Sequence, residues 1–504
     1  MFKGPDELEL TSGDVGMPLF WLSLPIVITN LLQTAYNLVD TFWLGQYSTT
    51  ALAAISFGFP LVFLFISFGL GLSVAGSVLV AQNTGAGDSR QAEYAASQTI
   101  LFSFVLATVL GVAGYFVVGD LLRLFGAAPA TQVAATSYLQ VITLGLPLMF
   151  GFLVFISLMR GYGDTVTPML VMFGSVVLNI ALDPFLIFGW TVLPNAPLVG
   201  TISFPELGIQ GAAYATVFSR GVAMVVGLAI MFRGNRGVKI RLSDMRPDLA
   251  YFRKILRIGV PASIEGTGRA ISVNALLVVV GGFSTVVVAG YGIGIRIFSV
   301  IFLPAIAVSQ GVETMVGQNV GAERVDRAST ATQFAAKWMF VLLGGLGVLI
   351  FLLPRPIAAV FTNDPAVVDI AAEFLRYVAL TFGFIGVMRA YTGAFRGAGH
   401  TLMAAVVAVS FLGFIRLPVA AILAYGVGPA ALTVAGQTVA IPELVTAIGP
   451  TGIWWGFIVS NIAGAVIAYA WFRRGTWKSG DVRGPAGDAP GAGSDSESEP
   501  STGD

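Results

Sequence analysis

The sequence predicts an all-α membrane protein with twelve transmembrane helices in two pseudo-symmetric six-helix bundles. Of its 504 residues, 56% are hydrophobic and only 11% are charged, whereas soluble domains carry about a quarter charged residues. Long unbroken apolar runs recur along the chain, where a transmembrane β-barrel would show short alternating segments. The two halves of the chain also align with each other at one fixed offset. Together these features indicate a polytopic helical protein built from a duplicated unit.

Each helix is predicted from a run long enough to cross a bilayer, which takes about 20 apolar residues. The predicted spans are 17–44, 52–82, 93–118, 133–158, 167–190, 208–232, 254–280, 286–317, 329–353, 367–395, 403–426 and 450–473.

These spans divide the chain into five parts. A polar segment (1–16) precedes a first lobe (17–232), and a basic linker (233–253) leads to a second lobe (254–474). The remaining residues, 475–504, are rich in Gly, Ser, Pro and acidic residues. That composition is typical of disorder, so we expect a disordered acidic tail.

Basic residues between the spans are concentrated on one side of the membrane. With twelve spans, both termini and the linker share that side, whereas the opposite loops hold only Arg123 and Arg355. Loops rich in Lys and Arg stay in the cytoplasm. We therefore expect a multi-pass protein of the cell (inner) membrane with both termini in the cytoplasm.

The internal repeat has an offset of 236 residues, set by the alignment of Pro25 with Pro261. Gln-Asn-Thr-Gly-Ala at 82–86 then aligns with Gln-Asn-Val-Gly-Ala at 318–322, and an Arg-Gly turn begins both at Arg160 and at Arg396. Six spans per half give both halves the same topology, so the repeats are parallel. Such carriers place a binding cavity between two lobes that rock to open it alternately to each face.

Two polar stripes cross the first lobe within its apolar spans. They are Asn30, Gln33, Asn37 and Asp40 on the first helix, and Ser175, Asn179 and Asp183 on the fifth. Ionisable groups inside a bilayer cost several kcal/mol and are functional candidates by default. Carboxylate and amide oxygens suit Na⁺, and two buried carboxyls close together favour holding a proton. The alternative for Asp183 is that it only caps or bends a helix before Pro184.

The carboxylate pair is absent from the second lobe, because Asp40 aligns with Leu276 and Asp183 with Val419. A feature needed only for architecture would more readily recur in both lobes. We therefore expect a one-sided coupling site, with Arg220 of the sixth helix as a possible counter-charge.

The second lobe carries its own intramembrane charges: Glu265, Arg269, Arg296, Glu313, Arg389 and Arg416. Glu265 and Arg269 are four residues apart on a helix, where side chains meet. Arg416 lies mid-span without a partner nearby in the sequence, which makes it the first candidate for an inter-helix or substrate contact. Structural pairing explains these charges as well as ligand binding does.

Several function classes are excluded. The chain has no Cys and a single His, His400, which excludes thiol chemistry and His- or Cys-rich metal sites. No Walker sequence is present, so ATP-driven transport within this chain is not expected. No nucleophile motif or catalytic cluster indicates an enzyme. The zero formal net charge argues against a nucleic-acid partner.

In these repeated turns and polar stripes, the chain resembles the prokaryotic DinF-type branch of the multidrug and toxic compound extrusion (MATE) family. The resemblance spans about residues 17–473 and is carried by the tracts at 33–45, 160–165, 179–189 and 211–216 and by the paired turns at 82–86 and 318–322.

The resemblance implies a secondary active antiporter. It would export organic, drug-like compounds, often cationic or amphiphilic, in exchange for H⁺ or Na⁺ and without a further cofactor. It implies a cation site of Asp40, Asn179, Asp183 and Thr216, which would ligate Na⁺ in a sodium-coupled carrier, with Asn37 nearby. Candidates for the substrate cavity are Asn30, Gln33, Tyr36 and Arg416. The expected state is a monomer surrounded by lipid.

The alternative within transport is a flippase or exporter of a lipid-linked or anionic amphiphilic precursor. It predicts a lateral opening to the bilayer and a ligand that favours the arginine-bearing second lobe. Branches of the family with a second cation site place an acid deeper in the seventh helix than Glu265, which follows Pro261 by four residues. We therefore expect no second cation site there.

Overall fold

The structure is a computed structural model that describes residues 8–482, apart from 127, 190, 197–199, 204, 429, 435–436 and 442–444. Within that part of the chain, ten helices are long and apolar enough to cross a membrane. Two bent helix pairs bring the number to twelve when each pair counts as one span. The helical membrane fold predicted from the sequence is thereby confirmed.

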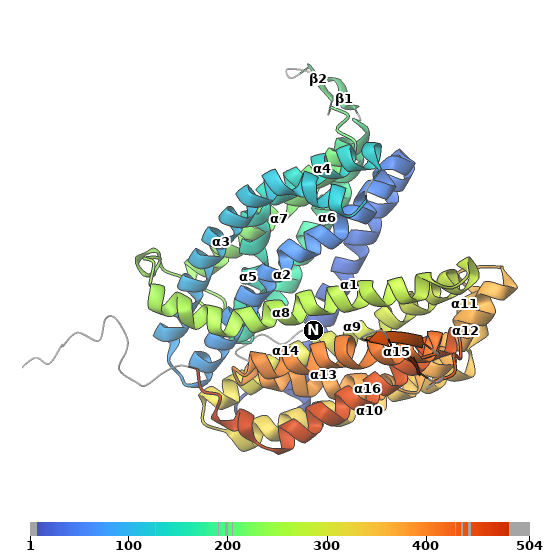
Figure 1. Ribbon diagram of the computed structural model, residues 1–504. Coiled ribbons are helices and arrows are strands. Elements are labelled where there is room, and N and C mark those ends of the chain that lie inside the picture. Colours follow the sequence, from blue (N-terminus) through green and yellow to red (C-terminus); the bar gives the residue numbers. More distant parts are fainter. Residues whose placement is uncertain are drawn as a thin grey trace, which may run out of the picture.

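The first half of the chain forms one helical bundle, the N-lobe, drawn in blue to green in Figure 1. Its elements are α1 (Gly16–Tyr47), α2 (Thr49–Gly85), α3 (Ser89–Leu124), α4 (Pro129–Leu144), α5 (Leu146–Tyr162), α6 (Val166–Phe188), the antiparallel hairpin β1 (Thr191–Ala196) and β2 (Gly200–Ser203), and α7 (Ile209–Arg233).

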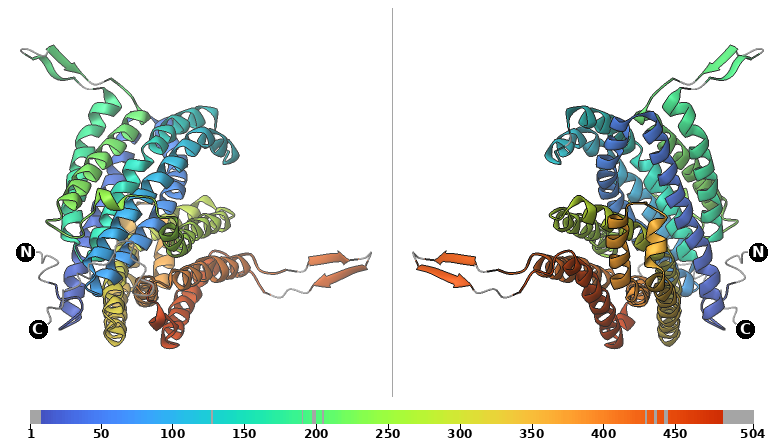
Figure 2. Two further views of the ribbon diagram at one scale, coloured as in Figure 1. Left: turned by 90° about the vertical axis from the view of Figure 1, so that its left-hand side faces the viewer. Right: turned by 90° about the vertical axis from the view of Figure 1, so that its right-hand side faces the viewer.

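The second half forms the C-lobe, drawn in yellow-green to red. After the short η2 (Leu242–Asp244), its elements are α8 (Leu249–Gly281), α9 (Thr285–Gly321), α10 (Val325–Leu352), α11 (Pro354–Ala359), α12 (Pro365–Ala379), α13 (Phe382–Gly397), α14 (Thr401–Val409), the π-helical η3 (Ser410–Arg416), α15 (Leu417–Tyr425), the hairpin β3 (Ala430–Val434) and β4 (Gln437–Ile441), α16 (Thr451–Arg473) and η4 (Thr476–Ser479). Figure 2 shows both hairpins extending away from their bundles.

The fourth and tenth predicted spans are each broken by a bend that the sequence analysis had not placed. α4 and α5 meet at 56°, and α12 and α13 meet at 53°. In the N-lobe, Pro147 in the first turn of α5 has no N–H to continue the helix from α4. The breaks fall at Gly145 and near Thr381, which are equivalent positions of the repeat.

The Arg-Gly turns of the repeat act as caps. Gly163 ends α5 with a positive φ of 108°, which glycine adopts without strain. Asp164 then accepts hydrogen bonds from the Val166 and Thr167 N–H groups at 3.1 and 2.9 Å and so caps α6. The turn thus sets the start of the helix that carries Asn179 and Asp183.

The two lobes meet at one end of the molecule, where α2 and α9 finish; we call this the closed end. An added Cβ on Gly85 would lie 1.9 Å from the Gln318 carbonyl oxygen, and one on Gly321 would lie 1.9 Å from the Gln82 carbonyl oxygen. Only glycine allows this approach. The lobes diverge from there toward α4 and α12 in Figure 1, and we call that side the open end.

The paired Gln-Asn turns hold the closed end together. The Gln82 side-chain amide donates to the Gly397 carbonyl at 3.1 Å, and the Gln318 amide donates to the Gly161 carbonyl at 3.1 Å. Each Gln thus bonds the Arg-Gly turn of the opposite lobe, and the two bonds are equivalent under the 236-residue repeat. The repeated motif therefore serves inter-lobe contact.

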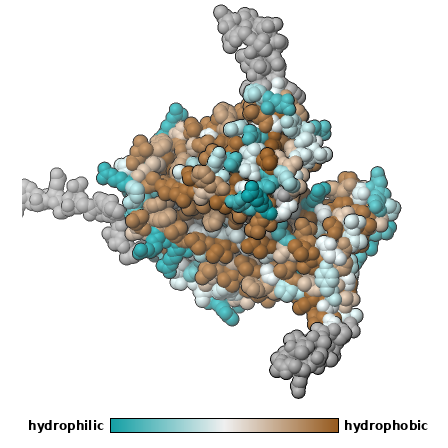
Figure 3. All heavy atoms as spheres, turned by 45° about the horizontal axis from the view of Figure 1, so that its top comes forward, coloured by the Kyte–Doolittle hydropathy of each residue, from teal (hydrophilic) through white to brown (hydrophobic). Residues whose placement is uncertain are grey.

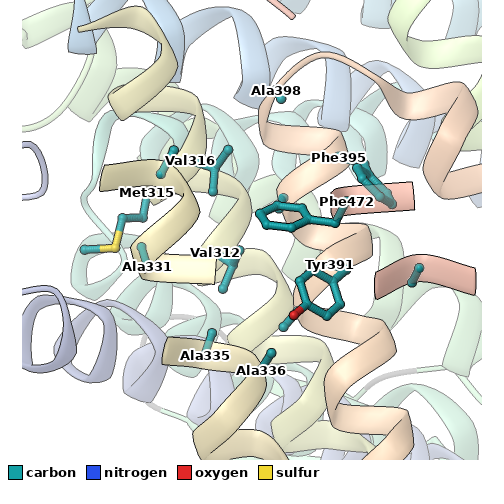
Figure 4. Packing of buried hydrophobic residues seen from close by; sticks show 14 of the residues in the cluster. Val312, Met315, Val316, Ala331, Ala335, Ala336, Tyr391, Phe395, Ala398 and Phe472 are labelled. Atoms are coloured by element: carbon teal, nitrogen blue, oxygen red, sulfur yellow. The ribbon is translucent and has the colours of Figure 1, made fainter. Parts of the chain in front are cut away.

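A hydrophobic cluster beneath the closed end fixes α9, α10, α13 and α16. Figure 4 shows Val312 and Val316 of α9 near Tyr391 and Phe395 of α13, with Phe472 of α16 beside them. On the outside, Figure 3 shows that apolar residues predominate over the visible face. Large exposed side chains such as Phe116 and Val278 are expected on a surface that meets lipid.

The chain segments next to the first and last spans pack against the closed end. Arg327 Nη2 donates to the Asp14 carbonyl at 3.0 Å, and the Asn319 amide donates to the Leu10 carbonyl at 2.9 Å. At the other terminus Trp477 is fully buried and stacks on Phe472 with centroids 4.6 Å apart.

Residues 475–482 therefore differ from the predicted disordered tail. An aromatic residue that fills a buried site outweighs the Gly-rich composition around it. Residues 483–504 and 1–7 lie outside the described part of the chain.

The linker between the lobes is tied to α3. Arg90 donates to both Asp244 carboxylate oxygens, with Nη2 at 2.6 Å from Oδ1. The hydrogen bonds from Arg90 hold the pKa of Asp244 below its ordinary value.

A depressed carboxyl pKa stabilises the fold above the unfolded value of about 3.9, and that stability is lost as pH falls through the folded pKa. We expect Asp244→Asn to lower the Tm by about 2 °C at pH 7, the scale of a lost ion pair of about 1 kcal/mol. The gap to wild type should close below about pH 4. Thermal unfolding of both proteins across pH checks this, and a gap that stays constant would contradict it.

Candidate cation and substrate site

Two carboxyl groups and an amide come together inside the N-lobe. Asp40 of α1 is 2% exposed, and Asn179 and Asp183 of α6 are fully buried. The Asn179 amide donates to Asp183 Oδ1 at 3.3 Å, and the Asp40 carboxyl lies within range of electrostatic interaction with Asp183. Ionisation of one carboxyl disfavours ionisation of another close by. The pair is therefore a candidate site for a bound proton or cation.

Three oxygens of this cluster have no hydrogen-bond partner among the described residues. They are Asp40 Oδ1, Asn179 Oδ1 and Asp183 Oδ2, all buried. Buried polar atoms in proteins almost always have partners, so such orphans need an explanation. Three hard oxygens in one buried cluster fit a sodium ion or further protonation. Among the described residues, no three His, Cys, Asp or Glu side chains gather as a metal site.

Thr216 reaches the cluster through Tyr36. The Tyr36 and Thr216 hydroxyls lie 2.5 Å apart, and both residues are buried. Tyr36 precedes Asp40 by one helical turn, so the two side chains share a face of α1. Tyr138 of α4 is also buried and lies within electrostatic range of both carboxyls. Sequence reasoning missed Tyr138, because nothing in its local spacing relates α4 to α1.

Arg220 of α7 belongs to a second polar group, which lies beside the carboxyl cluster. Its Nη2 donates to Gln33 Oε1 at 2.6 Å, and the Gln33 amide donates to Asn37 Oδ1 at 3.1 Å. The guanidinium carbon lies 4.8 Å from the centre of the Tyr36 ring, a cation–π distance. Tyr36 therefore stands between the Arg220 group and the carboxyls.

The structure thus divides the predicted residues into two groups. Asp40, Asn179 and Asp183 form the buried cluster, with Thr216 joined through Tyr36. Asn37 is exposed and belongs with Gln33 and Arg220, so it does not contact the carboxyls in the described hydrogen bonds. Asn30, earlier on α1, is partly buried, and its Nδ2 has no partner among the described residues.

Arg416 makes an inter-helix contact in the C-lobe. Its Nε donates to Ser460 Oγ at 3.0 Å, and its Nη2 donates to Asn461 Oδ1 at 2.8 Å, both on α16. The guanidinium carbon lies 4.0 Å from the centre of the Phe457 ring. Arg416 ends η3, and Pro418 follows two residues later; proline disturbs helical bonding on its N-terminal side. The lone arginine is therefore held by α16 within its own lobe.

The Glu265–Arg269 pair predicted from spacing is present, with Arg269 Nη2 3.5 Å from Glu265 Oε1. Both residues belong to a larger buried network that sequence reasoning missed. Arg396 Nη1 donates to both Glu265 oxygens at 3.1 Å, and its Nε donates to Glu313 at 2.9 Å. The one available signal was the recurrence of Arg160 and Arg396 at equivalent positions of the repeat.

A sequence profile of the MatE family matches residues 25–185 and 261–422. The two matches begin at Pro25 and Pro261, the positions that set the repeat offset. They cover more than half of the chain.

Relatives match over nearly the whole length. The chain is 26% identical to the probable multidrug resistance protein YoeA of Bacillus subtilis, over 92% of this chain and 96% of that protein. It is 28% identical to a protein named FAD transporter from Shewanella oneidensis, over 83% of this chain and 90% of that protein.

The fold also matches a solved structure described as the outward-facing conformation of a multidrug resistance MATE family transporter of the MOP superfamily. The TM-score is 0.80 at 24% identity, over 94% of this chain and 98% of that chain.

Proposed function

The chain belongs to the MatE family of membrane transporters, and on that premise we propose that it exports organic compounds in exchange for H⁺ or Na⁺ by alternating access. Family membership establishes a transporter rather than an enzyme. The coupling ion, the site residues and the direction of transport are our proposal. Relatives named as multidrug resistance proteins support a drug-like substrate class.

The observation that carries the proposal is the buried Asp40–Asn179–Asp183 cluster with its three orphan oxygens. Two carboxyls in a low-dielectric site cannot both ionise without a counter-cation. The site therefore exchanges one bound cation or proton for another, or releases it. Because the C-lobe equivalents of both acids are apolar, one lobe alone carries the coupling.

The mechanism follows from the geometry of the two lobes. We assign the closed end to the cytoplasm, which agrees with the basic linker and with termini packed there. The structure then corresponds to an outward-facing carrier. Cation or proton entry from outside neutralises Asp40 and Asp183, changes the packing of α1 against α6 and α7, and weakens the hold on the substrate.

Release of the cation to the cytoplasm resets the carrier. A ligand drives such a cycle only through different affinities for the two states. The Tyr36–Thr216 contact and the Arg220–Gln33 contact both join α1 to α7, so they transmit the occupancy of the acids to the substrate side of α1. The carrier is proposed to act as a monomer surrounded by lipid.

Efflux from proteoliposomes with one imposed gradient at a time tests the proposal. The purified chain is reconstituted with ethidium inside, and a pH gradient or a Na⁺ gradient is applied at zero membrane potential. We expect one of the two gradients to drive efflux above the rate of protein-free liposomes. Efflux that responds to neither gradient would contradict antiport.

A second candidate function is export of an anionic amphiphile, as expected for the flippase alternative. The observation that favours it is the excess of buried arginine in the C-lobe. The relative named FAD transporter supports it as well, because FAD is an anionic compound. This candidate differs from the first in substrate charge and leaves the coupling site unchanged.

A further inference from the structure

The interior of the C-lobe holds more arginine than carboxylate among its described residues. Its buried or largely buried charged groups are Glu265 and Glu313 against Arg269, Arg389, Arg396 and Arg416. Four guanidinium groups thus accompany two carboxyls. Uncompensated charge in a low-dielectric interior is costly. An anion brought by the transported compound would remove that cost.

The excess is concentrated around one carboxylate of α8. Arg396 occupies both oxygens of Glu265 at 3.1 Å. Arg269 and Arg389 remain at 3.5 and 3.7 Å from the same Glu265 oxygen. Both contacts are longer than the two bonds from Arg396, so Glu265 holds these two guanidinium groups less closely. Arg269 and Arg389 therefore retain N–H donors that can bind a further anion.

Orphan donors support this account. Arg269 Nε and Arg389 Nε are buried without a partner among the described atoms. Arg389 is 5% exposed overall, and its guanidinium carbon lies 4.5 Å from the centre of the Phe302 ring. Guanidinium groups bind carboxylate and phosphate through paired N–H donors. Arg389 against the Phe302 ring, with Arg269 at the same carboxylate, fits a flat compound that carries an anionic group.

This cluster adjoins the junction of the lobes. Glu313, which accepts from Arg396 at 2.9 Å, lies 4.0 Å from Arg160 of the N-lobe. Arg269 lies further along α8 toward the open end, and its side chain is 29% exposed. At the repeat offset Arg269 is equivalent to Gln33, which binds Arg220 in the N-lobe. The two lobes therefore present equivalent positions of α1 and α8.

We propose that Arg269 and Arg389 bind an anionic group, a phosphate or carboxylate, of the exported compound at the junction of the lobes. This inference rests on the proposed transport function and names its substrate class. The aspartate cluster of the N-lobe binds the coupling cation, and the arginine pair of the C-lobe binds the substrate anion. The N-lobe lacks the equivalent pair, because Leu153 stands opposite Arg389 in the repeat.

Binding of matched fluorescent probes to the solubilised full chain tests the assignment. Riboflavin and flavin mononucleotide share one ring system and differ by a phosphate, and ethidium supplies an aromatic cation. We expect flavin mononucleotide to bind at least tenfold more tightly than riboflavin. Equal affinity of the two flavins, no binding of flavin mononucleotide, or tighter binding of ethidium would overturn the proposal.

Variants test which residues produce the preference for flavin mononucleotide over riboflavin. Arg269→Gln should reduce flavin mononucleotide affinity to the riboflavin level without changing riboflavin affinity, whereas Arg269→Lys should keep most of the preference. Glu265→Gln should tighten binding of flavin mononucleotide, because it removes the competing charge; a purely structural role predicts weaker binding. Arg123→Gln, at an exposed arginine paired with Asp120, is the control and should match wild type. A preference that survives Arg269→Gln would overturn the assignment.

A lipid competition experiment distinguishes a headgroup phosphate from a soluble anion as the natural ligand. Phosphatidylglycerol added to nanodiscs of zwitterionic lipid competes with flavin mononucleotide when a headgroup phosphate is the natural ligand, and has no effect when the ligand is a soluble anion. Both outcomes support the anion site. The binding test needs no gradient, so its result does not depend on whether the chain is an antiporter. Gradient-driven ethidium efflux without any preference for flavin mononucleotide would overturn this inference and leave the proposed antiport intact.

Discussion

Asp40→Asn and Asp183→Asn are each expected to reduce gradient-driven efflux to the rate of protein-free liposomes. Asparagine keeps the shape of the side chain and its hydrogen bonding but can neither take up a proton nor supply the charge that binds Na⁺. The carrier should then bind substrate with an affinity that no longer depends on pH or Na⁺. Because no buried charge is added, the fold should survive.

Efflux and equilibrium binding of the same probe, measured in parallel, check this prediction. Asp120→Asn is the matched control, because Asp120 lies in the same lobe with a side chain 77% exposed. It should transport as wild type does. Wild-type efflux by either buried variant would reject the assignment of the coupling site.

The second large effect is expected at the closed end, in the double variant Gly85→Ala with Gly321→Ala. Each new Cβ would lie 1.9 Å from a backbone carbonyl oxygen of the other lobe. Overpacking costs about 1–3 kcal/mol where neighbours can shift, and here both neighbours are backbone. The closed end should therefore open, which leaves the carrier biased toward one state and unable to complete its cycle.

Accessibility of a single cysteine introduced at Ala86, measured with a membrane-impermeant maleimide, reports this opening in a chain that has no native cysteine. The double variant should label faster than wild type and lose most of its efflux. Gly344→Ala is the control, because a Cβ there meets nothing within 4 Å. Unchanged labelling together with wild-type efflux would contradict the role of the paired turns.

The spans were predictable because their signal is local and strong. A run of about 20 apolar residues is read without knowledge of the fold, and the common offset from Pro25 to Pro261 predicts the duplication. The bends at Gly145 and Thr381 were not predicted, because each bent pair is apolar enough as a whole to be taken for one continuous span. The packing of Trp477 was hidden by its Gly-rich neighbourhood.

The site was predicted in part, and for a physical reason. Asn179 and Asp183 are four residues apart, so one face of α6 must carry both. The polar stripe of α1 is wider than a single line of contact. Tyr36 and Asp40 belong to the carboxyl cluster, whereas Gln33 and Asn37 belong to the hydrogen-bond chain that begins at Arg220. Spacing along one helix cannot tell these lines apart.

The network of buried charges in the C-lobe could not be predicted from the sequence. Arg396 bonds Glu265 and Glu313 across 131 and 83 residues, so no local pattern relates them. Only the tertiary packing of α8, α9 and α13 brings one arginine between two carboxylates.

The central claim is that occupancy of the aspartate cluster moves the lobes. Spin labels at Leu124→Cys and Val360→Cys measure it most directly, because these equivalent positions of the repeat lie at the open end and are 79% and 81% exposed. Double electron–electron resonance should give an inter-lobe distance that changes when the coupling cation is added to the wild-type background, and a constant distance in Asp40→Asn. A distance indifferent to pH and Na⁺, or the same change in the variant, would contradict the account.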